Sequence, residues 1–195
     1  MSHIKLIVGL GNPGPDYHAT RHNAGATFLD ALASSQHQNF KSEKKFHGQY
    51  AKINLQGKDI HLLFPSTFMN LSGQAVQALC QFFKIQPEEI LVVHDELDID
   101  SGTMKLKKGG GHGGNNGLRD IIEKFGGNKN FKRLRLGIGH PGSAAKVTGH
   151  VLGKPSKKEK EQLDDCINEA IIHLAEVTHG DWQTAMLKLH SFKAQ

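Results

Sequence analysis

The chain alternates between short apolar runs and segments whose apolar residues recur at helical spacing, and this alternation limits its possible folds more than any other feature. The runs predict strands, and the periodic segments predict helices. We expect strands at residues 4–10, 49–55, 59–64, 90–93, 104–107 and 131–138. We expect helices at residues 24–33, between Asn70 and Pro87, at 118–125, from Ser156 to Gly180, and from Asp181 onward.

Strands that alternate with helices favour the α/β class. The runs at 49–55 and 59–64 are separated only by Gln56-Gly57-Lys58, which is typical of a hairpin with a glycine turn. Because a hairpin makes the sheet mixed, we expect a three-layer sandwich whose twisted, partly parallel sheet is flanked by helices. The 195 residues exceed a common single domain but fall short of two, so one domain over residues 1–195 is expected.

The cysteines and the apolar runs indicate the cellular compartment of the protein. Cys80 and Cys166 lie in helical patterns without a CxxC motif, so we expect two buried thiols and neither a disulfide nor a zinc site. The sequence begins without a signal-peptide pattern, and no apolar run approaches the ~20 residues needed to span a bilayer. We therefore expect a monomer in the cytoplasm with no membrane contact and no obligate protein partner.

The net charge leans modestly toward polyanionic partners. There are 24 Lys and Arg residues against 19 Asp and Glu residues, which gives a formal charge of +5. Many basic proteins bind no nucleic acid, so this balance alone does not identify a partner.

A glycine motif, Gly9-x-Gly11-x-x-Gly14, follows the first expected strand and matches the fingerprint of dinucleotide-binding loops. In that fingerprint the helix begins inside the glycine run, whereas here the helical pattern begins only near Ala24. The acidic residue expected about twenty positions later is also absent from residues 31–36. We therefore interpret the glycines as a tight loop and not as a nucleotide site.

Polar residues suited to chemistry follow the expected strands. Asn12 comes after the first strand, Asp95 after the apolar strand at 90–93, and His22 at the entry to the first helix. Loops at strand ends gather into one crevice in α/β sheets, and a histidine beside a carboxylate can act as a general base. No serine or cysteine lies in a nucleophile-elbow context, so water is the expected nucleophile. The alternative is that His22, one of 13 histidines, lies on the surface or caps the helix.

Sequence blocks rich in glycine, asparagine and histidine recur along the chain. They read GLGNPG at 9–14 with TRHNAG at 20–25, PSTFMNLSG at 65–73, HDELD at 94–98, GGGHGGNNG at 109–117 and RLRLGIGHPG at 133–142. In order and spacing, the blocks resemble those of bacterial-type peptidyl-tRNA hydrolases. The resemblance implies the fold of that family and hydrolysis of the ester between a peptide and the terminal ribose of tRNA, which recycles the tRNA during translation.

The resemblance also implies roles for individual residues, with no cofactor and no metal. His22 would be the base that activates water, Asp95 its partner, and Asn12 and Asn116 further catalytic residues. The implied substrate-binding residues are Tyr17, Phe68, Met69, Asn70, Gly113 and Asn116. The block at 109–117 carries Asn115 where the family often has histidine.

Two expected strands present cations on the face opposite the core. Alternation places Lys105 and Lys107 away from Met104 and Leu106, and it places Arg133 and Arg135 away from their apolar neighbours. The resemblance implies that Lys107 and Arg135 hold the phosphate at the 5′ end of tRNA. It also implies a helical cover over the substrate groove at about 155–195, which begins near the basic cluster Lys154, Lys157, Lys158 and Lys160, although a solvated helix end explains that cluster equally well.

Two other functions remain open from sequence. The first is an RNA-binding module that keeps the fold without hydrolysis, which the presence of both His22 and Asp95 disfavours. The second is a metallohydrolase that uses His94, Asp95, His112 or His140, although none of their spacings is a strong metal-ligand pattern.

Overall fold

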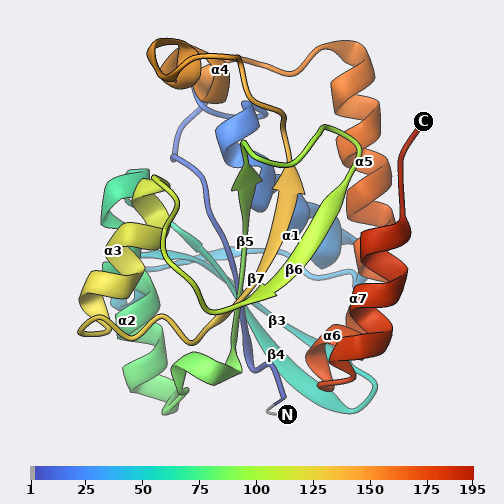
Figure 1. Ribbon diagram of the computed structural model, residues 1–195. Coiled ribbons are helices and arrows are strands. Elements are labelled where there is room, and N and C mark those ends of the chain that lie inside the picture. The colour runs from blue at the N-terminus through green and yellow to red at the C-terminus, as the bar shows by residue number, and fades with distance from the viewer. Residues whose placement is uncertain (1–2) are drawn as a thin grey trace.

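A seven-stranded mixed sheet forms the centre of the computed structural model, which describes residues 3–195 (Figure 1). Its order is β2-β3-β4-β1-β5-β7-β6. The strands are β1 (Leu6–Gly9), β2 (Lys41–Glu43), β3 (Gly48–Leu55), β4 (Lys58–Pro65), β5 (Ile90–Glu96), β6 (Met104–Lys108) and β7 (Lys132–Gly137). β4, β1, β5 and β7 run parallel, whereas the two edges are antiparallel.

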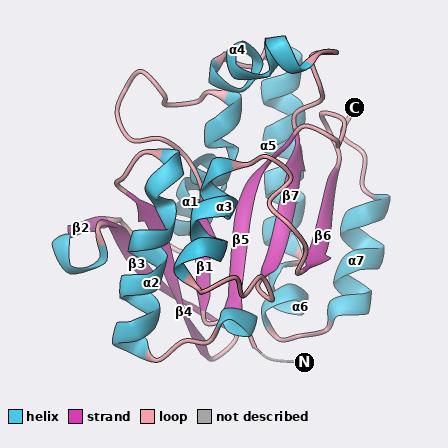
Figure 2. Cartoon of the chain, turned by 60° about the vertical axis from the view of Figure 1, so that its left-hand side comes forward, coloured by secondary structure: helices cyan, strands magenta, loops and turns pink. Residues whose placement is uncertain are grey.

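Helices cover both faces of this sheet (Figure 2). One face packs against α1 (Ala24–Ser35), α5 (Lys157–Ile172), α6 (Leu174–Thr178) and α7 (Trp182–Ser191). The other face packs against α2 (Ser72–Phe83) and α3 (Asn116–Lys124). The short helix α4 (Val147–Leu152) lies above the carboxyl ends of the parallel strands in Figure 1, outside both layers.

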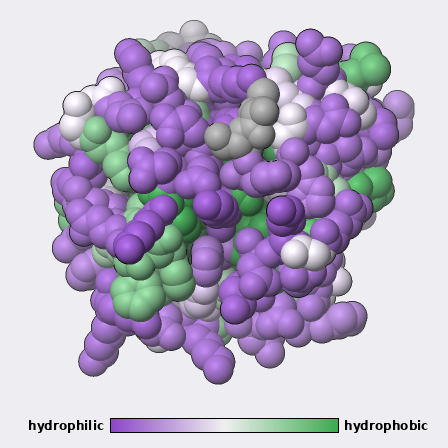
Figure 3. All heavy atoms as spheres, turned by 90° about the horizontal axis from the view of Figure 1, so that it is seen from below, coloured by the Kyte–Doolittle hydropathy of each residue, from purple (hydrophilic) through white to green (hydrophobic). Residues whose placement is uncertain are grey.

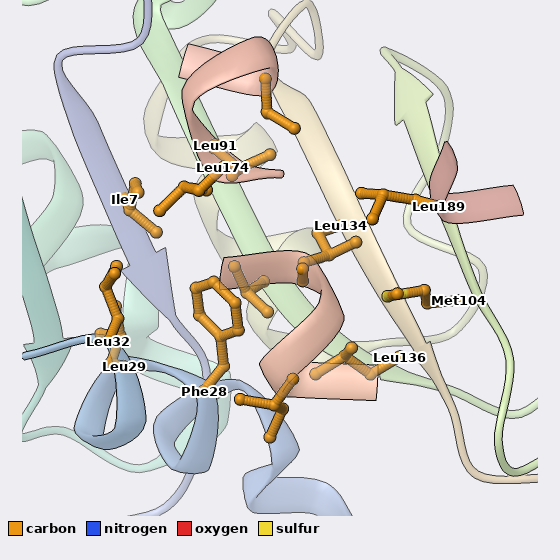
Figure 4. Close-up of a cluster of buried hydrophobic side chains, with 14 of the residues drawn as sticks. Ile7, Phe28, Leu29, Leu32, Leu91, Met104, Leu134, Leu136, Leu174 and Leu189 are labelled. Carbon is orange, nitrogen blue, oxygen red and sulfur yellow. The ribbon is translucent and has the colours of Figure 1, made fainter. Parts of the chain in front are cut away.

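The central strands supply side chains to two separate cores because alternate residues point to opposite faces. Ile7, Leu91 and Leu134 join the core beneath α1 and the C-terminal helices, as Figure 4 shows. Val8 and Val92, their neighbours in sequence, join the core beneath α2. Because β1 and residues 90–93 of β5 are covered on both sides, these segments are continuously apolar.

The predicted α/β sandwich with its mixed sheet is confirmed, and so are the hairpin and the burial of both cysteines. The start of α5 is closed by a capping box between Ser156 and Glu159. Three elements differ from the expectation. The tail helix is divided at His173 into α5 and α6, while the edge strand β2 and the helix α4 were not expected. No helix within residues 3–195 is both long and apolar enough to cross a bilayer.

Close packing brings α1 onto the ends of the central strands. A Cβ atom at Gly25 would lie 2.2 Å from the carbonyl oxygen of Val93, and one at Gly9 would lie 2.4 Å from the carbonyl oxygen of Gly25. Only glycine permits these approaches. As a result, the start of α1 lies close to the carboxyl end of β5, and so does the 3₁₀ turn η1 (Arg21–Asn23) that precedes it.

The opposite end of the molecule presents a largely hydrophilic surface, interrupted by smaller apolar areas (Figure 3). Phe82, which is 58% exposed, is the most exposed aromatic residue among residues 3–195. The parallel strands finish at the other end of the molecule, beneath α4 (Figure 1).

Candidate active site

His22 and Asp95 form the centre of the crevice. The Nδ1 atom of His22 lies 2.9 Å from Oδ2 and 3.1 Å from Oδ1 of Asp95. Asp95 comes from the end of β5 and its side chain is 3% exposed, whereas that of His22 is 14% exposed. Since Nδ1 is engaged by the carboxylate, Nε2 is the ring nitrogen left to interact with a molecule in the crevice.

Two opposing effects set the pKa of His22. Burial disfavours the charged imidazolium and lowers the pKa, but the negative charge of Asp95 and its hydrogen bond raise it by more. The pKa therefore lies above the ordinary value of 6.5.

Asn12 is held rigidly beside the pair. Its Oδ1 accepts a hydrogen bond of 2.6 Å from the backbone N–H of Met69. Asn23 clamps the Asn12 backbone from both sides, because its Oδ1 accepts from the Asn12 N–H and its Nδ2 donates to the Asn12 carbonyl, each at 2.9 Å. The Nδ2 group of Asn12 is thereby left to donate into the crevice.

Two hollows meet at His22 and Asn116. The first, of about 270 Å³, runs between η3 (Met69–Leu71) and α4. It is lined by Asn12, His22, Phe68, Met69, Asn70, Asn116, Thr148, Val151 and Leu152. The second, of about 420 Å³, extends beneath the glycine-rich loop and includes Asp95, Glu96, Leu97 and Gly113 in its lining.

The structure therefore brings most of the predicted catalytic and substrate-binding residues together. Among these, Tyr17 is the exception, since it is not among the residues that line either hollow. Its ring instead packs edge-on against Phe68, with 6.0 Å between the ring centroids. Phe68 is 55% exposed, so Tyr17 supports an aromatic side chain at the rim of the first hollow.

Asn116 is the first residue of α3, and its position depends on the loop before it. Asn115 caps the helix, because its Oδ1 accepts from the backbone N–H of Leu118 at 3.0 Å. Arg133 binds the carbonyls of Gly110 and Gly111 farther back in the loop. Asn115 is thus a helix cap, a role that asparagine performs well.

The cations of β6 and β7 lie on one face but are not equivalent. Register places Lys105 opposite Arg135 and Lys107 opposite Arg133. Arg133 is 2% exposed and engaged by the loop, so it is not presented at the surface as the alternation had suggested. Lys107 is exposed, and Arg135 is partly exposed with Nη1 4.0 Å from Glu96.

After β7, only Ala144 and residues of α4 line the two hollows. Thr148, Val151 and Leu152 line the first hollow, whereas α5, α6 and α7 pack on the sheet through residues such as Ile167 and Leu189. No residue after Leu152 lines either hollow.

The histidines considered as metal ligands are engaged by the backbone. Nδ1 of His94 donates to the carbonyl of Asp95 at 2.8 Å, while Nδ1 of His112 accepts from the N–H of Gly114 and Nδ1 of His140 from that of Gly142. Within residues 3–195, no group of three or more His, Cys, Asp or Glu side chains is placed to hold a metal ion.

Sequence reasoning missed the residues that support the site. Asn23, Asp120 and Arg133 each fix a backbone group, with Asp120 accepting from the N–H of Gly73 at 2.7 Å. Such pairs join segments far apart in the chain and leave no periodic signal. Asn23 lies within a recognised block, but nothing in that block indicated what it contacts.

Comparison with known proteins gives one consistent result. The family model described as peptidyl-tRNA hydrolase matches residues 6–195. The peptidyl-tRNA hydrolase of Hahella chejuensis is 61% identical over 191 residues, covering 98% of each chain, and that of Pectobacterium atrosepticum is 59% identical over 194 residues, covering 100% of each. A crystal structure of peptidyl-tRNA hydrolase from Acinetobacter baumannii superposes with a TM-score of 0.95 at 48% identity, covering 99% of this chain and 97% of that one.

Proposed function

The chain belongs to the peptidyl-tRNA hydrolase family, and from this we propose that it hydrolyses the ester between a peptide and the terminal ribose of tRNA with His22 as general base. The observation that carries the proposal is the 2.9 Å contact between His22 Nδ1 and Asp95 Oδ2 at the floor of the crevice. We place the reaction in the cytoplasm, where peptidyl-tRNA arises during translation.

The chemistry begins with water held between His22 and the substrate. Nε2 takes a proton from the water as its oxygen attacks the ester carbonyl, and Asp95 stabilises the imidazolium that forms. When the tetrahedral intermediate collapses, the bond to the ribose oxygen breaks and His22 returns the proton to that oxygen. The products are a peptide with a free carboxyl group and a tRNA with a free terminal hydroxyl.

The site amides stabilise the intermediate without adding a competing base. Asn12 has a free Nδ2 donor because its Oδ1 is engaged by Met69. A donor aimed at the developing oxyanion is worth about 3 kcal/mol in the transition state. We assign Asn12 and Asn116 to the carbonyl and the water, and Asn70 to the peptide backbone.

The substrate fits the crevice in two parts. Phe68 and Met69, supported by Tyr17, form the apolar side of the groove for the peptide and the terminal nucleoside, and Gly113 leaves room at the loop. Lys107 and Arg135 take the 5′-phosphate on the neighbouring face of the sheet, and the exposed cluster at Lys154, Lys157 and Lys158 extends the positive surface.

The test of the activity compares two substrates that differ by one group. Purified protein is incubated with N-acetylated aminoacyl-tRNA and with the same aminoacyl-tRNA left unblocked. We expect release of the amino acid from the blocked form only. Binding of tRNA without hydrolysis of either form contradicts the proposal and favours an RNA-binding module.

The role of His22 is tested with His22→Ala in the same assay. We expect turnover to fall by roughly 10³-fold while tRNA affinity changes little, because general-base catalysis contributes about 10²–10⁴-fold. The matched control is His3→Ala, an exposed histidine at the other end of the molecule. Near-normal turnover in His22→Ala contradicts the assignment.

A further inference from the structure

The helix α4 forms one wall of the groove, yet the hydrophobic core does not hold it in place. None of its six residues, Val147–Leu152, is buried. Most short helices in proteins depend on packing of an apolar face for their stability. The position of α4 must therefore depend on polar contacts.

Those contacts converge on Arg21, the neighbour of His22 in η1. The Nη1 group of Arg21 donates to the carbonyl of His150 at 3.0 Å, and its backbone N–H donates to the carbonyl of Gly153 at 3.0 Å. A Cβ atom at Gly153 would lie only 3.0 Å from Arg21 Nη1, so the chain after α4 fits closely around this side chain. One further contact, between His150 Nε2 and the carbonyl of Ile138 at 3.0 Å, ties α4 to the end of β7.

Arg21 is itself held by Glu159 at the start of α5. The Nε and Nη2 groups of Arg21 donate to Oε2 and Oε1 of Glu159 at 3.3 and 3.1 Å, an arrangement in which the planar guanidinium meets the carboxylate through two bonds. Oε1 of Glu159 also accepts from the backbone N–H of Ser156 in the capping box of α5. The hydrogen bond from Arg21 lowers the pKa of Glu159 to about 2, so the pair stays charged at any pH at which translation occurs.

We propose that Arg21 is a positioning residue for the hydrolysis: paired with Glu159, it fixes α4 as the wall of the groove at a set distance from the adjacent His22. The same side chain holds the carboxyl end of α4, the beginning of α5 and, through the chain, the turn that carries the base. The wall and the base are thus located relative to each other. The expected kinetic effect rests on the proposed function, whereas amide hydrogen exchange tests the hold of Arg21 and Glu159 on α4 independently of it.

The pair acts on substrate binding and not on the chemical step. Thr148, Val151 and Leu152 contact whatever occupies the groove, whereas His22 and Asp95 make their own hydrogen bond without Arg21. Loosening α4 therefore weakens the hold on the substrate and raises KM, while kcat changes little. Global stability also changes little, because no residue of α4 is buried.

The first experiment uses Glu159→Gln, which keeps an acceptor for the Ser156 N–H but removes the charge that holds Arg21. With N-acetylated aminoacyl-tRNA we expect KM to rise about fivefold and kcat to stay within about twofold, the size expected for a partly buried ion pair. Amide hydrogen exchange in residues 144–153 should become faster. The matched control is Asp164→Asn, which breaks the exposed 2.6 Å pair with Lys160 in the same helix and should alter neither quantity.

The second experiment combines Arg21→Gln with Glu159→Gln. If the two residues act as a unit, the double variant resembles the worse single variant, with a coupling of at least about threefold in KM. The proposal is overturned if the KM increases of the two single variants multiply in the double variant. It is also overturned if amide hydrogen exchange in residues 144–153 is unchanged in Glu159→Gln. If the unaltered protein fails to hydrolyse the blocked substrate, the proposed function fails, while the exchange measurement still decides whether Arg21 and Glu159 hold α4.

Discussion

At the scale of single residues, the basicity of His22 is set by its two surroundings, the buried floor of the crevice and the Asp95 carboxylate. The carboxylate prevails and the pKa of His22 is raised. A base must be neutral to accept a proton, so the raised pKa lowers the neutral fraction near pH 7 but makes the neutral form a stronger base. Asp95 also fixes which ring nitrogen faces the crevice.

The pH profile should report this balance. We expect kcat/KM for N-acetylated aminoacyl-tRNA to rise with pH through an inflection above 6.5, the ordinary pKa of histidine, as His22 loses its proton. In Asp95→Asn the charge that raises the pKa is removed while the burial that lowers it remains, so the inflection moves to lower pH. The plateau rate falls by roughly 10²-fold because the imidazolium is no longer stabilised.

Glu96→Gln is the control for that profile, since Glu96 also carries a charge at the end of β5 but is paired with Arg135. Its inflection should match that of the unaltered protein. An Asp95→Asn profile that keeps the original inflection contradicts the role given to Asp95.

At the scale of elements, the sequence predicted those helices and strands that bury an apolar stripe. The strands β1, β5 and β7 and the helices α1 and α2 carry such stripes, and they were predicted within a few residues. The exposed strand β2 and the unburied helix α4 carry none, so no periodicity marked them. The helical spacing continues through His173 because α5 and α6 both face the sheet, which hid the break between them.

The residues of the site were likewise predictable from the sequence, but the contacts that hold them were not. His22, Asp95 and Asn12 follow strands or precede a helix, and the sequence could place them in one crevice. The contacts that hold them, such as Arg21 with Glu159, join residues 138 positions apart. A polar pair of that kind has no pattern in a single sequence, so only the structure reveals it.

The close approach of α1 to the strand ends should be sensitive to one methyl group. In Gly25→Ala the new Cβ would lie 2.2 Å from the carbonyl of Val93 in β5 and 2.6 Å from the nitrogen of Leu10, the residue after β1. We expect the free energy of unfolding, measured in urea, to fall by about 2–3 kcal/mol because helix and sheet are forced apart.

Gly149→Ala is the matched substitution, because it also lies in a helix but its Cβ would meet no atom within 4 Å. It should leave the free energy of unfolding unchanged or raise it slightly, since alanine favours a helix by up to about 1 kcal/mol over glycine. Equal effects at Gly25 and Gly149 would show that the approach of α1 is not tight.

At the scale of the whole molecule, the crevice and the cationic face lie side by side on the half of the sheet formed by β5, β7 and β6. Arg135 pairs in register with His94, the residue before Asp95. A tRNA whose 5′-phosphate rests on Lys107 and Arg135 can therefore extend its terminal ribose toward His22. The net charge of +5 favours polyanionic partners in general, whereas these cations would direct the proposed substrate to one face.

The dependence of KM on salt concentration tests the proposed phosphate contacts. We expect KM for the tRNA substrate to rise steeply with salt, because each neutralised phosphate releases counterions. In Lys107→Ala or Arg135→Ala, KM should be higher at low salt and the slope of log KM against log salt should fall by about 1. Lys58→Ala, at the exposed start of β4, is the control and should keep the original slope. A KM that does not vary with salt argues against phosphate binding at this face.

The order of the strands has a kinetic consequence for the crevice. β1 pairs with β4 and β5, so Leu6 finds His61 on one side and Ile90 on the other, both far along the chain. Pairings of such long range close large loops and form slowly, whereas the β3–β4 hairpin forms locally and early. The crevice exists only after these late pairings are complete. During refolding, the return of hydrolysis therefore tracks the slowest folding phase and measures completion of the whole sheet.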